Sequence, residues 1–338
     1  MPRPVHLVGS IPLDNAETVF RRVSHHLGEH VARIPDGETG IRKHWIGWQL
    51  GKMGEHAFLE AIPEDPAAAP ARLLRLKPDT PDDAITFGPL GYAEAARNSW
   101  PVFERLQADG VIPAGVRFQV SLPTPLAPVT RFLRREDRHR VEGAYHDRML
   151  TELAEILAAI PHDRLAIQWD VAIEFAILEG VWPAHFDAVE SGILSRLTGL
   201  SGQVSEPVHL GFHLCYGDYG HRHFVEPADT ARLVRVANAL NDRVDRAIQW
   251  FHMPVPRNRT DAAYFQPLAD LELSASSTTL FLGLLHRTDG LDGARQRAEA
   301  ARTVRDDFGI ATECGFGRRP PETIADLLTL YARAATAL

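Results

Sequence analysis

Eight short apolar runs, separated by segments with helical periodicity, constrain the fold of this chain more than any other feature of its sequence. Most of these runs have apolar residues on both faces, which is typical of parallel strands that are covered by helices outside and packed inside a barrel. The predicted strands are residues 5–11, 31–35, 116–122, 165–171, 208–215, 247–253, 279–286 and 310–314. Strands that alternate with helices in this way predict an α/β fold, a (β/α)8 TIM barrel.

The segments between the strands include helices with clear apolar seams, and one connection is unusually long. Val19 and Val23 belong to the first seam, Met149 and Leu153 to another, and the last helix follows two prolines. The long connection, residues 39–115, is an insertion after the second strand, with an irregular Ala/Pro-rich loop at Ile62–Pro70. We expect one domain, residues 1–338, with the insertion over the barrel mouth as a lid.

Composition excludes several classes of protein. The net charge of −8 and the scattered arginines disfavour binding to nucleic acid. No apolar stretch approaches the roughly 18 residues that span a membrane, and the first residues resemble a buried strand rather than a signal peptide. Two cysteines in 338 residues cannot form a disulfide scaffold. The sequence therefore predicts a soluble, cytoplasmic protein that acts on small molecules.

The two cysteines fall at the ends of predicted strands, where barrel enzymes place their chemistry. Alternate residues of a strand point the same way, so His213 and Cys215 form half of a metal site. Cys314, at the end of the last strand, is the remaining soft ligand. One nitrogen and two thiolates favour zinc, with a fourth position open for catalysis. The alternative is two ordinary buried cysteines beside a hydrogen-bonded core histidine.

Two further histidines end neighbouring strands. His252 is a candidate for the fourth zinc ligand, with Glu226 and His223 as alternatives, or it is a histidine of the core. His286 ends the seventh strand and is a candidate catalytic proton donor, because the pKa of histidine lies close to neutral pH.

Ser10, Glu38 and Asp170 form a second candidate group, which contains no soft ligand. Two carboxylates bind an ammonium group, whereas a hydroxyl and backbone amides bind a carboxylate. These three residues are therefore predicted to hold an amino acid substrate. Each residue also has a purely structural interpretation: Ser10 as a turn residue, Glu38 as a charge at the start of a helix, and Asp170 as the partner of an arginine.

Five short motifs follow one another along nearly the whole chain. They are Val8-Gly9-Ser10-Ile11-Pro12, Asp36-Gly37-Glu38, Gln168-Trp169-Asp170, His213-Leu214-Cys215-Tyr216 and Glu313-Cys314-Gly315-Phe316-Gly317-Arg318-Arg319. In order and approximate spacing they resemble the motifs of cobalamin-independent methionine synthases and the short archaeal methionine synthases, within the uroporphyrinogen decarboxylase-like superfamily. The resemblance implies a zinc-dependent thiol alkyltransferase, with His213, Cys215 and Cys314 as zinc ligands.

The resemblance also implies that Ser10, Glu38 and Asp170 grip homocysteine and that His286 matches the histidine after the penultimate strand. Two departures stand out: Val171-Ala172 replaces the Glu-Pro of the family, and no glutamate ends the sixth strand. The alkyl donor stays open, since a folate, a corrinoid or a smaller electrophile would fit. A metal-free lyase or decarboxylase on this barrel, or a non-catalytic zinc- or corrinoid-binding protein, are the alternative functions.

Overall fold

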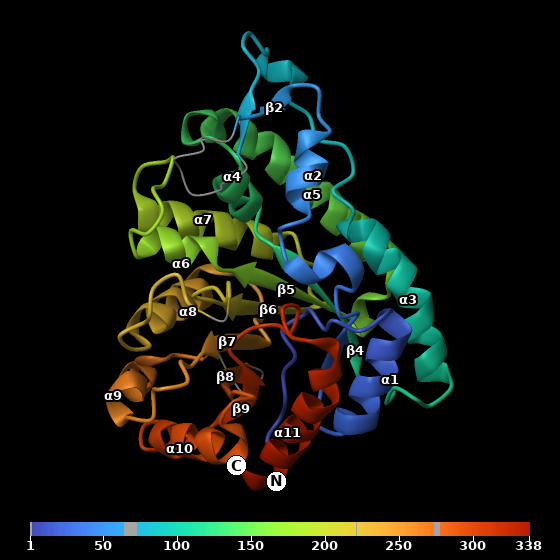
Figure 1. The fold of residues 1–338 in the computed structure, drawn as a ribbon, viewed down its shortest axis with the longest axis vertical. Coiled ribbons are helices and arrows are strands. Elements are labelled where there is room, and N and C mark those ends of the chain that lie inside the picture. Colours follow the sequence, from blue (N-terminus) through green and yellow to red (C-terminus); the bar gives the residue numbers. More distant parts are fainter. Residues whose placement is uncertain (1, 64–72, 221, 274–277) are drawn as a thin grey trace.

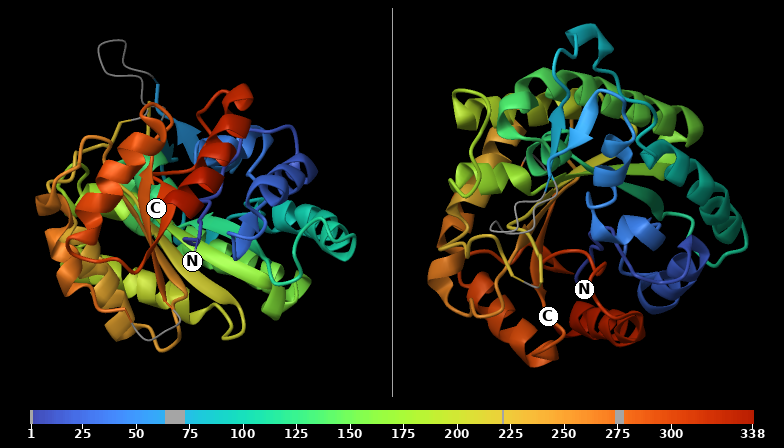
Figure 2. Two further views of the ribbon diagram at one scale, coloured as in Figure 1. Left: turned by 90° about the horizontal axis from the view of Figure 1, so that it is seen from below. Right: turned by 45° about the horizontal axis from the view of Figure 1, so that its top comes forward.

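A curled sheet of seven parallel strands forms the centre of the protein. The computed structural model describes residues 2–63, 73–220, 222–273 and 278–338. The strand order is β1-β4-β5-β6-β7-β8-β9, and helices surround the sheet (Figures 1 and 2). The strands are β1 (Arg33–Pro35), β4 (Arg117–Pro123), β5 (Leu165–Val171), β6 (His209–Leu214), β7 (Trp250–Pro254), β8 (Thr279–Leu285) and β9 (Phe308–Thr312). This mixed α/β architecture, expected from the apolar runs, is that of a TIM-like barrel.

The segment predicted as the first strand, residues 5–11, lies between the two edges of this sheet but pairs at a single residue. Val5 forms parallel bridges with Val31 on one side and Ile310 on the other. Beyond it, the side-chain amides of Gln119 and Gln168 donate to the backbone carbonyl of Val8, at 2.9 and 2.6 Å. These side chains take the place of strand-to-strand hydrogen bonds. This explains why the strand predicted at residues 5–11 is reduced to isolated bridges at Val5.

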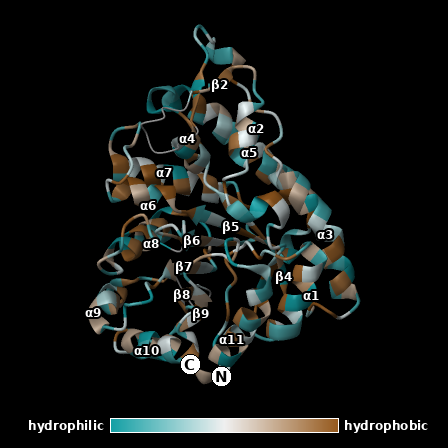
Figure 3. Ribbon diagram, in the orientation of Figure 1, coloured by the Kyte–Doolittle hydropathy of each residue, from teal (hydrophilic) through white to brown (hydrophobic). Residues whose placement is uncertain are grey.

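Amphipathic helices cover the outside of the sheet, with hydrophobic residues on part of their surface and hydrophilic residues on the rest (Figure 3). In α1, the Asn15 side chain accepts a hydrogen bond from the Thr18 amide at 2.9 Å and starts the helix, and Val19 and Val23 are buried. Outside residues 40–91, the α-helices of the described ranges are α1 (Ala16–Leu27), α3 (Tyr92–Ala108), α4 (Leu126–Phe132), α5 (Arg138–Ala159), α6 (Ile173–Leu178), α7 (Val189–Gly202), α8 (Ala231–Arg243), α9 (Ala262–Phe265), α10 (Gly290–Arg302) and α11 (Ile324–Ala337). Within the described ranges, no helix is both long and apolar enough to cross a bilayer.

The connection between β1 and β4 has secondary structure of its own. It contains α2 (Gln49–Gly54) and an antiparallel hairpin of β2 (Leu59–Ala61) and β3 (Leu74–Leu76), at the top of Figure 1. The hairpin was not predicted, because three-residue strands are too short to show an alternating pattern. Residues 64–70 of the predicted Ile62–Pro70 loop lie outside the described residues.

Candidate metal centre

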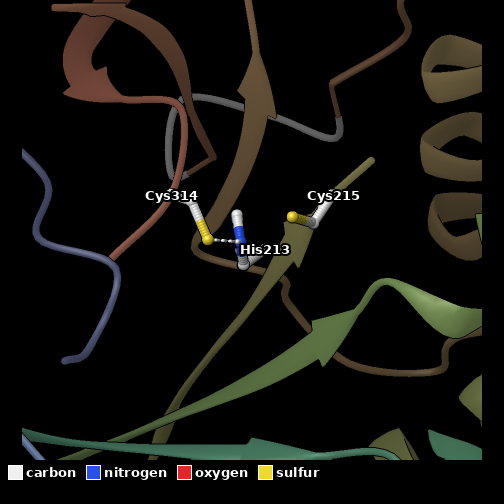
Figure 4. A group of neighbouring side chains, drawn as sticks. All are labelled: His213, Cys215 and Cys314. Carbon is white, nitrogen blue, oxygen red and sulfur yellow. Dashed lines mark hydrogen bonds between the residues drawn. The ribbon is translucent and has the colours of Figure 1, made fainter. Parts of the chain in front are cut away.

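Three side chains from distant parts of the chain meet at the carboxyl end of the sheet. His213 lies in β6, Cys215 directly follows β6, and Cys314 follows β9. One ligand atom from each residue lies within 4.8 Å of the other two, and His213 Nε2 is 3.7 Å from Cys314 Sγ (Figure 4). The side chains of His213 and Cys215 share a side of the strand, as their spacing predicts. An imidazole nitrogen and two sulfurs at this separation form a donor set that suits zinc.

His252 contacts His213 rather than joining this group. Its Nε2 lies 2.9 Å from the carbonyl oxygen of Thr312, which can only accept, so Nε2 carries the proton. The Nδ1 atoms of His252 and His213 are 2.6 Å apart. With His252 neutral, its Nδ1 accepts and His213 Nδ1 donates. The lone pair of His213 is then on Nε2, which faces Cys314.

The environment of Cys215 favours its thiolate, the form that binds metals. The neighbouring Cys314 thiol, the nearby His213 and a hydrogen bond from the Gly217 amide lower the pKa of Cys215. The Gly217 nitrogen is 3.2 Å from Cys215 Sγ. Gly217 has a φ of 81°, so a glycine fits where the chain turns back to offer this amide.

The group opens into a cavity of about 570 Å³ that also contains the predicted amino acid site. Ser10, Glu38 and Asp170 line it together with the three candidate ligands. Aromatic side chains, among them Trp45 from the long insertion and Trp182, form much of its wall. Sequence reasoning missed both tryptophans, because neither lies at the end of a predicted strand or within one of the motifs.

The Glu38 and Asp170 carboxyl groups form an acidic pair in this cavity. Burial, followed by the charge of Asp170, raises the pKa of Glu38 well above its usual range. Burial raises the pKa of Asp170 to about 7, although Gln168 donates to its Oδ1 at 2.8 Å. Glu38 itself has a φ of 47°, a left-handed conformation that is uncommon outside glycine and is frequent at binding sites. Such a pair is suited to an ammonium ligand, which would stabilise both charges.

Ser10 joins the wall of the cavity to the loop that bears Cys314. Its Oγ accepts a hydrogen bond from the Gly317 amide at 3.2 Å, and its carbonyl accepts from Phe316 at 2.7 Å. A Cβ on Gly317 would overlap the carbonyl oxygen of Lys43, which belongs to the long insertion. Three segments that are distant in sequence therefore interlock around the candidate ligand.

Of the remaining predicted residues, His223 lines the cavity, whereas His286 and Glu226 do not. His286 is not among the residues that line the cavity; its Nε2 donates to the Val255 carbonyl at 2.9 Å. Its Nδ1 lies 3.5 Å from one oxygen of Glu313, whose other oxygen is 3.2 Å from His223. His223, which lines the cavity, also contacts Glu226 at 3.1 Å. The signal for Glu313 in the sequence is its place next to Cys314, at the end of the last predicted strand.

Comparison with solved structures identifies proteins of the same fold. The chain is similar to a B12-independent methionine synthase from Shewanella sp. W3-18-1, solved in complex with selenomethionine. The TM-score is 0.58 and the identity 12%, over 99% of this chain and 97% of that chain. A methyltransferase from Methanosarcina mazei is similar at a TM-score of 0.50 and 12% identity, over 99% and 94% of the two chains. No protein-family model and no curated protein sequence matches the chain. At this identity the similarity establishes a shared fold.

Proposed function

We propose that this protein is a zinc-dependent enzyme that transfers a methyl or other alkyl group to a thiol, with an amino acid thiol such as homocysteine as the acceptor. The observation that carries the proposal is the convergence of His213, Cys215 and Cys314 in one cavity with the acidic pair of Glu38 and Asp170. The two solved structures of the same fold, a methionine synthase and a methyltransferase, agree with this class of reaction.

His213, Cys215 and Cys314 would hold the metal, and His252 would set the tautomer of His213. The fit rests on the hydrogen bonds of His252, which leave the lone pair of His213 Nε2 on the side of the two sulfurs. With these three residues as ligands, a bound zinc would supply Lewis acidity that lowers the pKa of a substrate thiol, so that the thiol would react as a thiolate. In this proposal His252 orients His213 and is not the fourth zinc ligand for which the sequence made it a candidate.

Glu38 and Asp170 would bind the ammonium group of the acceptor, and Ser10 with nearby backbone amides would bind its carboxylate. Binding both ends of the amino acid directs the thiol side chain towards the cysteines. The acceptor sulfur then attacks the alkyl carbon, and the electron pair of the broken bond leaves with the donor. Trp45 and Trp182 exclude water from one side of this reaction. The donor is a folate, a corrinoid or a smaller electrophile.

We also infer that residues 1–338 are one (β/α)8 barrel domain in which the segment around Val5 fills the eighth strand position. Its two parallel bridges support this inference. The insertion, residues 39–115, would act as the lid predicted from its length, because its residues 43–47 line the cavity. His286 would position Glu313 and His223, instead of giving a proton to the substrate directly.

Metal content and turnover together test the proposal. Protein purified under reductant without chelator is expected to contain about one zinc per chain. His213→Gln and Cys314→Ser should lose most of it, whereas His286→Gln, a matched histidine change just outside the cavity, should keep it. Methyl transfer to homocysteine should be lost together with the zinc in His213→Gln and Cys314→Ser.

Two results would contradict the proposal. Protein without zinc that also takes up none on incubation would exclude the metal centre and favour a metal-free lyase. Stoichiometric zinc without alkylation of any amino acid thiol, from a folate, a corrinoid or a methyl halide, would leave a binding protein.

A further inference from the structure

A run of five arginines, within residues 131–140, joins the end of α4 to the start of α5 (Figure 1). Four of them donate hydrogen bonds to carboxylates or backbone carbonyls: Arg134, Arg135, Arg138 and Arg140. Arg131 differs, because in the described ranges its guanidinium forms neither an ion pair nor a hydrogen bond. It is also the arginine of this run that lines the cavity.

The guanidinium of Arg131 is accessible to a ligand. The residue is half-buried, and its nitrogens are not among the buried polar atoms that lack a partner in the described structure. Because these nitrogens also form no hydrogen bond, they are exposed to water. The cavity of about 570 Å³ provides the space, since pockets of roughly 300 to 1,000 Å³ hold ligands much larger than an amino acid.

Aromatic side chains form the cavity wall beside Arg131. Phe132 follows it in α4, and the centre of its ring lies 5.7 Å from the guanidinium carbon of Arg131. Arg135 and Arg138 donate to the carbonyls of residues 184 and 183, which holds the segment directly after Trp182 against the arginine run. Phe132 and Trp182 both line the cavity. A ligand that contacts Arg131 therefore also meets an apolar, aromatic surface.

This wall lies apart from the acidic pair that is predicted to hold the acceptor. Besides burial, the charges that act on the pKa of Glu38 are those of Asp170, Arg42 and Asp36, and the charge of Arg131 is not one of them. An amino acid bound to Glu38 and Asp170 would thus leave Arg131 free for a second ligand.

Other cations of the cavity favour an anionic ligand as well. Lys43 and Arg222 line it, and neither forms an ion pair in the part of the chain that the structure describes. Asp218, which also lines the cavity, lies 3.8 Å from Arg318. In a protein with a net charge of −8, unpaired cations around one cavity attract negatively charged ligands to it.

We propose that Arg131, Phe132 and Trp182 bind the second substrate, and that this alkyl donor carries a negatively charged group on an apolar body. A carboxylate, sulfonate or phosphate of the donor accepts charge-assisted hydrogen bonds from Arg131, while the body packs against the two aromatic rings. That the ligand is an alkyl donor rests on the function proposed above. The binding site itself requires neither zinc nor an acceptor.

Two fluorescent dyes that differ only in a sulfonate group test this site: 8-anilinonaphthalene-1-sulfonate and N-phenyl-1-naphthylamine. In fluorescence titrations without acceptor, wild-type protein should bind the sulfonate dye more tightly, and added salt should weaken that dye selectively. Arg131→Met keeps a long apolar side chain but removes the charge. It should weaken the sulfonate dye by roughly 10-fold or more and leave the neutral dye unchanged. Arg131→Lys should be intermediate, because it keeps the charge without the planar fork of donors.

Arg135→Met is the control, since Arg135 is an exposed arginine of the same run that does not line the cavity. This variant should bind both dyes as the wild type does. Equal affinity of wild type and Arg131→Met for the sulfonate dye, or an equal loss in Arg135→Met, overturns the proposal. Should Arg131→Met not fold, crystals of the wild type with the sulfonate dye decide: a sulfonate beside Arg131 supports the site, and one elsewhere overturns it. Zinc content and methyl transfer, measured on the same preparations, report on the proposed function separately.

Discussion

Asp170 accepts a hydrogen bond from Gln168 and faces the cavity, so its charge can be removed while its shape is kept. Asp170→Asn is expected to weaken homocysteine binding by roughly 10-fold or more, because one charged partner of the ammonium group is lost. Zinc content should be unchanged. Titration of homocysteine into the zinc-loaded variant measures the effect, with 4-mercaptobutyrate as control, since it lacks only the amino group and should bind both proteins equally. Loss of zinc without a change in homocysteine affinity would assign Asp170 to the metal centre instead.

His252 lies in direct contact with a candidate ligand, and its replacement tests the hydrogen bond between the two imidazoles. His252→Ala should lower zinc affinity by roughly 10- to 100-fold through loss of the orienting contact, without loss of a ligand. His252→Gln, whose amide oxygen can still accept from His213 Nδ1, should recover part of this. Absorption spectra of the cobalt-substituted variants check the ligand set. A change of coordination number in His252→Ala would make His252 a ligand, as the sequence first indicated.

Glu174, in α6, is a buried carboxyl outside the cavity that predicts a pH effect on stability. It accepts a hydrogen bond from Thr124, its Oε2 has no partner in the described structure, and burial raises its pKa to about 7. Between the pKa of the unfolded chain, about 4.5, and 7, the folded protein holds this proton more tightly. The contribution of Glu174 to stability is therefore present below pH 4.5 and is lost as the pH rises to 7.

Glu174→Gln should remove this dependence. Above pH 7 the variant is expected to be more stable than wild type by roughly 1 to 3 kcal/mol, because it needs no buried charge. Urea unfolding at pH 5 and pH 8 measures the difference, which should be larger at pH 8. A variant that is less stable at both values would show that the charged form has a partner.

At the scale of the elements, the loop after β9 and the insertion are held together by close backbone contact. Gly317→Ala would push its Cβ into the Lys43 carbonyl and is expected to cost roughly 1 to 3 kcal/mol of unfolding free energy. Zinc affinity should fall as well, since Cys314 lies on the same loop. Gly115→Ala is the control, because a Cβ there meets nothing within 4 Å. Thermal unfolding and zinc competition measure both effects, and equal behaviour of the two variants would argue against the interlock.

The sequence predicted the regular elements well where apolar runs were long. β5 has the predicted bounds, residues 165–171: all seven of its residues are buried, and neither glycine nor proline interrupts them. The extent of the first strand could not be predicted correctly, since the carbonyls of Leu7 and Val8 accept hydrogen bonds from the side chains of Gln119 and Gln168, which lie more than 100 residues away. Local patterns carry no information about such partners.

The candidate site was predictable to a similar extent. The spacing of His213 and Cys215 indicated a shared side of a strand, and Cys314 was the only other cysteine. The hydrogen bonds of His252 depend on the register of β6 and β7 and on the Thr312 carbonyl, and no single segment of sequence contains this information.

At the scale of the whole molecule, the proposed zinc joins residues 101 positions apart in sequence, so it should contribute to global stability. Removal of the metal by a chelator is expected to lower the melting temperature by about 4 °C when zinc was present at about 100 times its dissociation constant. Differential scanning calorimetry before and after chelation, with re-addition of zinc, measures this change. Cys314→Ser should melt at one temperature in both conditions, and an equal response of this variant would point to another metal site.

The bridges of Val5 with Val31 and Ile310 also have a consequence for synthesis on the ribosome. The segment around Val5 emerges first, yet one of its two neighbouring strands, β9, is translated some 300 residues later. At about 5 to 20 residues per second, the early strands wait for at least about 15 seconds with one edge open. Cys215 in turn waits for Cys314, which is translated 99 residues later, so a nascent chain cannot assemble the candidate site before its last strand has left the exit tunnel.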